Sequence, residues 1–183
     1  MSTVLVPLAQ GCEELEAVTV IDLLRRAGIE VITAGLDDQV VIASHGTRLV
    51  PDTDLDSALI RDYDMVVLPG GLPGADNLDN DDRIHSLLRK MAASEKFTAA
   101  ICAAPRILAN AGLLDGRKAT SYPGVLDKMN LPSTRISNQP VVMDGKIITS
   151  RSPGTAMDFA LALIEALAGQ DKRRQVETAL VRP

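Results

Sequence analysis

Short apolar runs alternate with amphipathic segments along most of this chain. Apolar runs occupy residues 3–8, 29–34, 65–68 and 97–101, and apolar positions with helical spacing occupy residues 13–27, 84–91 and 156–167. The run at 65–68 has no polar alternation, which is typical of a strand covered on both faces. This order of strands and helices predicts parallel strands joined by right-handed crossovers, and therefore a doubly wound α/β fold.

Local signals add detail to this plan. The segment 13–27 begins with three glutamates and ends with two arginines before Gly28, as expected for a helix with favourable charges at both ends. Turn residues at Ser44-His45-Gly46 lie between β-prone pieces and predict a small hairpin beside the parallel sheet and not part of it. Asp144-Gly145 between two further β-prone pieces predicts a second hairpin. A polar helix over residues 171–180 is expected to complete the fold.

Composition limits the range of functions. With 183 residues and 46% hydrophobic content, residues 1–183 are expected to form a single domain. The net charge of −5 and the pI near 5.0 provide no general attraction to phosphate backbones, which argues against nucleic-acid binding as the main role. Two cysteines form no disulfide framework, and no secretory or membrane-spanning segment is evident, so we expect a soluble cytoplasmic protein without a membrane partner.

Cys102 is the most informative single residue. It follows the apolar run 97–101 and leads directly into a helix-like segment, as a nucleophile does on a sharp strand-to-helix turn. Such a turn places the side chain near amide donors and a helix N-terminus, which favour the reactive thiolate. The alternative is a small buried core residue, the commonest fate of a free cysteine.

Two further loops are expected to meet Cys102, because the carboxyl ends of adjacent parallel strands converge on one crevice. A carboxyl group beside a thiolate should have a raised pKa, and amides after glycines or after the nucleophile can stabilise an oxyanion. The candidates from the three loops are Glu13, Glu14 and Glu16, then Gly70 and Gly71, then Cys102 and Ala103.

Each candidate also has a purely structural interpretation. The glutamates suit the first turn of any helix, and Gly70-Gly71 suits any tight turn. Cys12 is either a second redox thiol or an exposed loop cysteine without function. His45 and His85 are interpreted as surface or boundary residues, and we expect no metal site because neither has evident partner ligands.

Four motifs in the same order resemble the ThiJ/PfpI superfamily, in the branch of the parkinsonism-associated protein deglycase and its bacterial relatives. They are Gly11-Cys12-Glu13-Glu14-Leu15-Glu16, Val67-Leu68-Pro69-Gly70-Gly71, Ala100-Ile101-Cys102-Ala103-Ala104-Pro105 and Thr149-Ser150-Arg151-Ser152-Pro153-Gly154-Thr155. The resemblance spans nearly the whole chain. It implies a flavodoxin-like α/β sandwich, a homodimer, and a cysteine that oxidises easily to sulfinic acid.

The resemblance also assigns roles by position. It implies that Cys102 is the nucleophile, that Glu16 is a protonated carboxyl group touching its sulfur, and that Gly70, Gly71 and Ala103 surround the oxyanion site. Residues implied to lie near the site or the dimer contact are Glu13, Arg26, His45, Tyr122 and Pro153. His45 stands where better-known relatives have an arginine, and Tyr122 stands where some members have a catalytic histidine.

The function implied by the resemblance is slow, cofactor-independent hydrolysis of reactive aldehydes or glycated amines and thiols to 2-hydroxy acids, as part of a stress response. Partners would be small aldehydes or glycated proteins, with nucleic acid only as a glycated substrate. Peptidase activity is not expected, because Ala103 replaces the histidine that follows the nucleophile in peptidase-like members. The alternative is a redox-sensing holdase chaperone without turnover. If Glu16 donates to the sulfur, Cys102 should titrate below the usual value of about 8.5.

Overall fold

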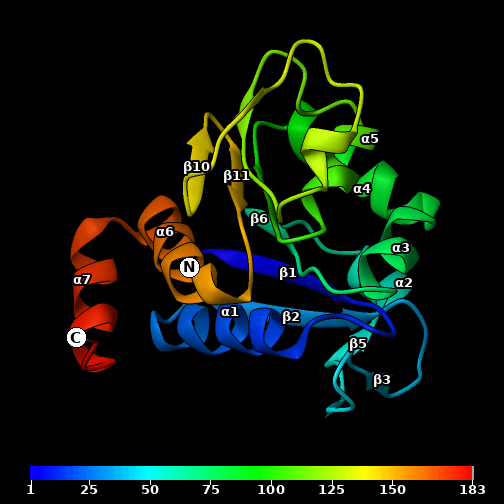
Figure 1. Ribbon diagram of the computed structural model, residues 1–183. Helices are drawn as coiled ribbons and strands as arrows, with labels where there is room; N and C mark the ends of the chain where they lie inside the picture. The colour runs from blue at the N-terminus through cyan, green and yellow to red at the C-terminus, as the bar shows by residue number, and fades with distance from the viewer. Residues whose placement is uncertain (183) are drawn as a thin grey trace.

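A computed structural model describes residues 1–182 and has one large, mostly parallel sheet at its centre (Figure 1). Its seven strands lie in the order β10-β11-β7-β6-β1-β2-β5, so the three strands expected to supply the site, β7, β6 and β1, are adjacent and central. The strands are β1 (Thr3–Leu8), β2 (Glu30–Gly35), β5 (Thr53–Asp54), β6 (Met65–Leu68), β7 (Phe97–Ile101), β10 (Val141–Asp144) and β11 (Ile147–Ser150). The doubly wound α/β fold expected from the sequence is confirmed.

Helices cover both faces of the sheet, because alternate residues of the central strands point into two separate cores. Val4 and Val6 of β1 pack into the core beneath α1, α6 and α7, whereas Leu5 packs into the core beneath α2 to α5. The helices are α1 (Glu14–Arg26), α2 (Leu55–Ala58), α3 (Gly74–Asp79), α4 (Asp82–Ala93), α5 (Pro105–Asn110), α6 (Ala156–Ala168) and α7 (Gln170–Ala179).

Both predicted hairpins form, but they have different places in the fold. The first consists of β3 (Val41–Ile42) and β4 (Arg48–Leu49), which pair as a separate antiparallel ribbon. The second, β10 and β11, belongs to the main sheet, because β11 pairs in parallel with β7. A third small sheet joins β8 (Lys118–Ala119) to β9 (Arg135–Ile136), and single 3-10 turns lie at η1 (Leu126–Lys128) and η2 (Pro153–Thr155).

The ends of α1 are fixed by the residues that its sequence supplies. Glu13 is the N-cap and its carboxylate accepts a hydrogen bond from the backbone of Glu16 at 2.7 Å, while Gly28 beyond the C-terminus adopts φ +77°. Glycine suits that conformation because it lacks a Cβ atom. The first turn of α1 is therefore held firmly where it meets the neighbouring loops.

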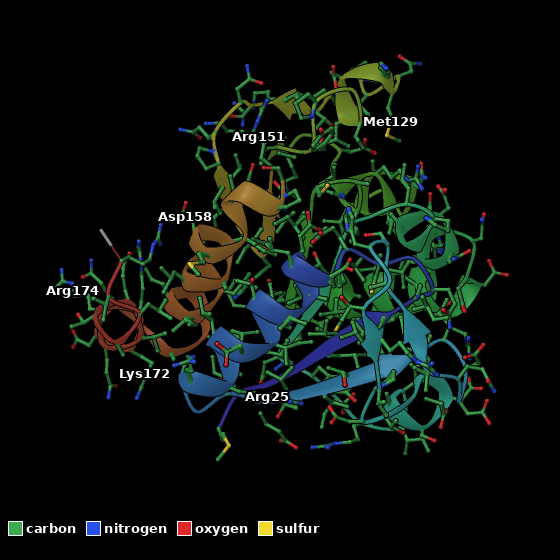
Figure 2. The ribbon with its side chains drawn as sticks, turned by 60° about the horizontal axis from the view of Figure 1, so that its bottom comes forward. Arg25, Met129, Arg151, Asp158, Lys172 and Arg174 are labelled. Carbon is green, nitrogen blue, oxygen red and sulfur yellow. The ribbon has the colours of Figure 1, made fainter. Side chains whose placement is uncertain are left out.

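The polar last helix, α7, packs on α6 at the outside of the molecule, with Lys172 and Arg174 carried on it (Figure 2). Only Val176 of this helix is buried, which accounts for its polar sequence. Within residues 1–182, none of the helices has the length and apolar character that a bilayer span requires.

Candidate functional site

Cys102 lies on the turn between β7 and α5 in a backbone conformation that few residues adopt. Its φ is +63°, and its side chain is almost buried, with 9% of the residue exposed. The Cys102 amide donates to the Ser150 carbonyl of β11 at 3.0 Å, and the Tyr122 amide donates to the Cys102 carbonyl at 2.9 Å. These two bonds hold the strained turn from both sides, which is the arrangement of a nucleophile elbow.

Glu16 is fully buried in the first turn of α1, facing the elbow. Its Oε2 accepts a hydrogen bond from the Gly70 amide at 2.8 Å, and its carboxyl group lies close enough to the Cys102 thiol for each group to shift the pKa of the other. Its Oε1 is buried without any conventional hydrogen bond. The structure thus joins two residues 86 positions apart, as the sequence predicted.

The close approach of thiol and carboxyl group depends on Gly70. A Cβ atom at this position would lie 2.7 Å from the Cys102 Cβ, 2.8 Å from Glu16 Oε2 and 2.9 Å from the Ile101 carbonyl oxygen. Gly71 has φ +87°, and a Cβ there would lie 2.4 Å from the Glu13 amide nitrogen. The glycines are therefore required by the packing of three loops as well as by the turn.

Burial sets the protonation of this pair. It raises the pKa of Glu16 to about 7, although the Gly70 amide and the Cys102 thiol act in the opposite direction. Burial, followed by the negative charge of Glu16, raises the pKa of Cys102 to about 12. The pKa of Glu16 is therefore raised, as expected. The expectation of a Cys102 pKa below the usual value is wrong, because burial and the charge of an ionised Glu16 outweigh the donors.

Two backbone amides act on the sulfur in the opposite direction. Those of Gly71 and Ala103 lower the pKa of Cys102 by hydrogen bonding. Amides that reach a developing anion in a buried site stabilise it strongly, because little solvent screens them. Gly71 and Ala103 are therefore placed to serve the oxyanion role that the sequence suggested.

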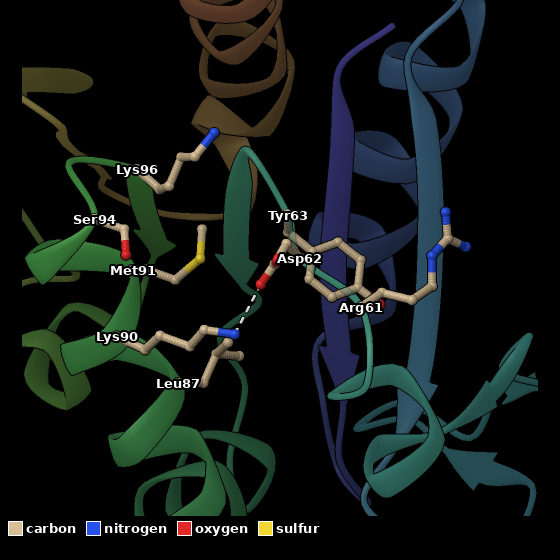
Figure 3. A pocket seen from close by; sticks show the side chains of 8 residues that line it. All are labelled: Arg61, Asp62, Tyr63, Leu87, Lys90, Met91, Ser94 and Lys96. Atoms are coloured by element: carbon tan, nitrogen blue, oxygen red, sulfur yellow. Dashed lines mark hydrogen bonds and ion pairs between the residues drawn. The ribbon is translucent and has the colours of Figure 1, made fainter.

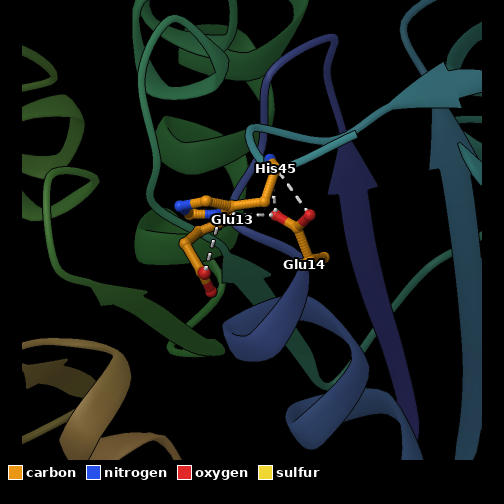
Figure 4. Close-up of side chains that lie close together, drawn as sticks. All are labelled: Glu13, Glu14 and His45. Atoms are coloured by element: carbon orange, nitrogen blue, oxygen red, sulfur yellow. Dashed lines mark hydrogen bonds and ion pairs between the residues drawn. The ribbon is translucent and has the colours of Figure 1, made fainter. Parts of the chain in front are cut away.

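Glu13, Glu14 and His45 form a cluster at the start of α1 (Figure 4). His45 Nδ1 lies 3.2 Å from Glu14 Oε2 and 3.6 Å from Glu13 Oε1, and the imidazole is 74% exposed. For His45 the expectation of no partner ligands is wrong, since one ligand atom from each of the three residues lies within 4.8 Å of the others. Protein donors already occupy the Glu14 carboxylate: the Ser44 hydroxyl and the His45 backbone bind it at 3.0 Å.

The other expected site residues lie at different distances from the elbow. Tyr122 lies beside the elbow through its backbone bond to Cys102, with about half of its surface exposed. Pro153 begins η2, three residues after the carbonyl that binds the Cys102 amide, and its place near the substrate stays a prediction. Arg26 is not near the site: it pairs with Asp22 at 2.7 Å at the far end of α1, about 18 Å along the helix from Glu14.

Cys12 is fully buried, so the interpretation as an exposed loop cysteine is wrong. Burial, together with the charges of Glu14 and Glu13, raises its pKa to about 12. The loop around it is tight, because a Cβ atom on Gly74 would lie 2.5 Å from the Cys12 backbone. Cys12 therefore packs the loop beneath the site.

Sequence reasoning missed the residues that hold the elbow and the hairpin. Ser150 supplies the carbonyl that binds the Cys102 amide, and Glu14 binds the backbone of the β3–β4 turn. Neither role leaves a local pattern, because each contact joins segments more than 30 residues apart. Ser150 does lie within the fourth family motif, which was the available signal.

A hollow at the other end of the sheet lies away from Cys102. A pocket of about 390 Å³ opens between the amino end of β6 and the last turns of α4 (Figure 3). Its cations are neutralised locally, since Lys90 pairs with Asp62 at 2.8 Å and Arg61 pairs with Glu30 at 2.9 Å. It is at the opposite end of the strands from the elbow and holds no candidate nucleophile.

Known proteins share the sequence pattern and the fold of this chain. The family model described as DJ-1/PfpI family matches residues 2–166. The chain belongs to the DJ-1/PfpI family. The crystal structure of Drosophila melanogaster DJ-1beta superposes with a TM-score of 0.94 at 41% identity, covering 100% of both chains. The family and the fold predicted from the four motifs are thus confirmed.

Two relatives differ in how much of their own length the match covers. Protein DJ-1 homolog A of Arabidopsis thaliana is 42% identical over 98% of this chain, but the match covers only 46% of that protein, so the chain spans about half its length. A Caenorhabditis elegans relative named glutathione-independent glyoxalase DJR-1.2 is 35% identical over 89% of this chain and 87% of its own length.

Proposed function

We propose that this protein hydrolyses reactive 2-oxoaldehydes, such as methylglyoxal, or the adducts they form with amines and thiols, and releases 2-hydroxy acids. The observation that carries the proposal is the contact of the Cys102 thiol with Glu16, whose pKa of about 7 suits a general base near neutral pH. The name of the nematode relative supports the same substrate class. Two buried free thiols suit a reducing compartment such as the cytoplasm.

The first step uses the carboxylate and the thiol together. Glu16 takes the Cys102 proton as the sulfur adds to the aldehyde carbon, which forms a hemithioacetal and moves negative charge to the aldehyde oxygen. The Gly71 and Ala103 amides stabilise that oxygen. A thiol with a raised pKa thus becomes nucleophilic only when a base and an acceptor carbon are both in place.

The remaining steps need no external oxidant. Glu16 first returns the Cys102 proton to the aldehyde oxygen, which gives the neutral hemithioacetal and restores the carboxylate. The carboxylate then removes the proton from the former aldehyde carbon and delivers it to the neighbouring carbonyl carbon, while the proton of the new hydroxyl group moves to the neighbouring oxygen, which gives a 2-hydroxy thioester. Water then attacks the thioester, which releases the 2-hydroxy acid and restores the Cys102 thiol. Overall, one 2-oxoaldehyde and one water molecule give one 2-hydroxy acid, so the reaction consumes no cofactor.

The decisive experiment counts product molecules for each protein molecule. Wild-type protein and Cys102→Ser are incubated with excess methylglyoxal, and lactate is measured over time. We expect many equivalents of lactate from the wild type and none above the uncatalysed rate from Cys102→Ser. One equivalent or less of consumed aldehyde, without lactate, contradicts the proposal.

A second candidate function is a redox-responsive chaperone without turnover. It is favoured by the burial of Cys12, the only other cysteine, which is inaccessible as a resolving thiol. A sulfenic acid on Cys102 would then proceed to sulfinic acid instead of a disulfide. Stoichiometric aldehyde consumption, combined with client protection that depends on peroxide and on Cys102, is the result expected of this alternative.

A further inference from the structure

The turn that joins β3 to β4, residues Ala43–Thr47, is attached to the loop that leads into α1. The Ser44 amide donates to the Cys12 carbonyl at 2.8 Å, and the Gly11 amide donates to the Ile42 carbonyl at 2.8 Å. The Gln10 side chain adds a bond to the Ile42 amide at 2.9 Å. The β3–β4 ribbon makes no strand pairing with the main sheet, so these contacts determine where its turn lies.

Glu14 makes several hydrogen bonds to this turn. Its carboxylate accepts hydrogen bonds from the Ser44 hydroxyl at 3.0 Å, from the His45 amide at 3.0 Å and from the Thr47 amide at 3.5 Å. Desolvation raises the pKa of Glu14, but hydrogen bonds from its own backbone and from His45, Ser44 and Thr47 outweigh it and lower the pKa to about 2, so the carboxylate is ionised at any physiological pH. Charge-assisted bonds of this kind are about twice as strong as neutral ones.

The attached turn also lies against Glu13, which binds the backbone of Glu16. The held turn places His45 Nδ1 3.6 Å from Glu13 Oε1, while Glu13 Oε2 binds the Glu16 amide at 2.7 Å. A continuous set of contacts therefore runs from Glu14 through the turn and His45 to Glu13, and from there to the backbone of the general base.

We propose that Glu14 is a positioning residue of the Cys102 site, which holds the Ala43–Thr47 turn so that His45 stays against Glu13 beside the substrate. The inference rests on the proposed function for its kinetic part. Glu14 makes no hydrogen bond to Cys102 or to the Glu16 side chain, and the imidazole that it positions is 74% exposed and open to a substrate, so we expect its effect in KM more than in kcat. His45 is the residue through which it acts.

The test compares Glu14→Gln, His45→Ala and the double variant with wild type, all in the presence of EDTA. Glutamine keeps the size of Glu14 but loses the charge and one acceptor oxygen. We expect amide hydrogen exchange at His45 and Thr47 to accelerate about tenfold in Glu14→Gln, as for loss of a charge-assisted bond in a surface turn. KM for methylglyoxal should rise several-fold, about 3 to 10 times, with kcat within about twofold.

Two comparisons make the result specific. Glu30→Gln is the matched control, because Glu30 also accepts side-chain bonds, from Thr3 and Arg61, but lies at the amino end of β2. It should change neither the exchange of the turn nor KM. If Glu14 acts through His45, the double variant should have the KM of His45→Ala alone and not the product of the two effects.

Several outcomes overturn the inference. Unchanged exchange at His45 and Thr47 in Glu14→Gln means that the turn is held by other contacts. Faster exchange with unchanged KM means that the turn does not serve the site, and multiplicative effects mean that Glu14 does not act through His45. If the wild type has no turnover, the proposed function fails, and the rate of Cys102 alkylation by iodoacetamide replaces KM as the measure: an unchanged rate in Glu14→Gln overturns the inference.

Discussion

Burial makes ionisation of the Glu16 carboxyl group unfavourable, and the folded protein loses stability where that group ionises. The folded protein raises its pKa from 4.5 to about 7, mainly by burial. In the unfolded chain the carboxyl group ionises near its ordinary value, so between about pH 4.5 and pH 7 the unfolded state binds fewer protons than the folded state. Stability therefore falls as pH rises through this interval, by about 3 kcal/mol at pH 8.

This cost predicts that Glu16→Gln is more stable than wild type at high pH. Glutamine keeps an oxygen for the Gly70 amide but carries no charge, so its advantage in unfolding free energy should approach about 3 kcal/mol at pH 8 and vanish near pH 4.5. Urea unfolding of both proteins at several pH values measures it. An advantage that does not change with pH would show that Glu16 is not the group that titrates.

The two cysteines should also differ in their reactivity toward peroxide. Both thiols have raised pKa values, but Cys102 is 9% exposed and is bonded by the Gly71 and Ala103 amides, whereas Cys12 is fully buried. Peroxide should therefore oxidise Cys102 first, because reactivity follows access and thiolate character. Peptide mass spectrometry at graded peroxide ranks the two sites, and equal modification of Cys12 contradicts this assignment.

At the scale of elements, the site depends on how closely the loop after β6 approaches α1 and β7. Gly70→Ala would place a methyl carbon within 3 Å of the Cys102 Cβ, the Glu16 carboxylate and the Ile101 carbonyl oxygen. The Cys102 Cβ and the Ile101 backbone cannot turn aside, and the Glu16 carboxylate can do so only by leaving its hydrogen bond with the Gly70 amide. We expect turnover to fall at least about tenfold, because separating thiol and base by a fraction of an ångström disrupts the reacting geometry. Steady-state kinetics measures the loss.

Gly28→Ala serves as the control for this prediction. Gly28 also lies next to α1 and has φ +77°, but a Cβ atom there meets nothing within 4 Å. It should lower stability by about 1 kcal/mol through backbone strain and leave turnover unchanged. Equal losses of turnover in both variants would mean that general destabilisation, and not crowding of the site, explains the effect.

Strand and helix positions in the central part of the fold could be predicted because they leave strong local signals. The apolar runs at Thr3–Leu8 and Met65–Leu68 match β1 and β6 residue for residue, and Gly28 ends α1 as expected. The short helix α3 and the two-residue strands β5 and β9 escaped prediction. Such brief elements are stabilised by tertiary contacts, which no local period records.

The candidate site was predictable to the extent that the order of strands decides it. Parallel strands place their carboxyl-end loops together, so the meeting of Cys102, Glu16 and Gly70 follows from topology. The pKa of Cys102 did not follow, because it depends on burial that only packing determines. The position of Arg26 at the far end of α1 did follow from the predicted helix over residues 13–27, and it was the resemblance that suggested a place near the site.

At the scale of the whole molecule, the exposed apolar side chains on two packed helices support the proposal of a homodimer. Leu15 and Val18 of α1 are 49% and 45% exposed, and Met157 of α6, the helix that packs on α1, is 44% exposed. Apolar surface on neighbouring helices beside the site is suited to an isologous contact.

Sedimentation of charged variants tests this proposal. Leu15→Asp should convert the dimer to monomer at micromolar concentration, because an unpaired charge would be buried in the contact. Ile60→Asp is the control, since Ile60 is 87% exposed beyond α2 on the other face of the sheet and should leave the dimer intact. A wild-type protein that is monomeric at all concentrations tested, or a dimer unaffected by Leu15→Asp, contradicts the proposed contact.

The central claim is that Glu16 takes the Cys102 proton, and the pH dependence of kcat/KM for methylglyoxal tests it most directly. Wild-type activity should rise through about pH 7 as Glu16 ionises, and Glu16→Gln should lose that rise together with about a hundredfold of its activity. His45→Ala is the control, because it removes the imidazole that lies 3.6 Å from Glu13 and leaves Glu16 in place. A rise near pH 7 that persists in Glu16→Gln, or one that disappears in His45→Ala, contradicts the claim.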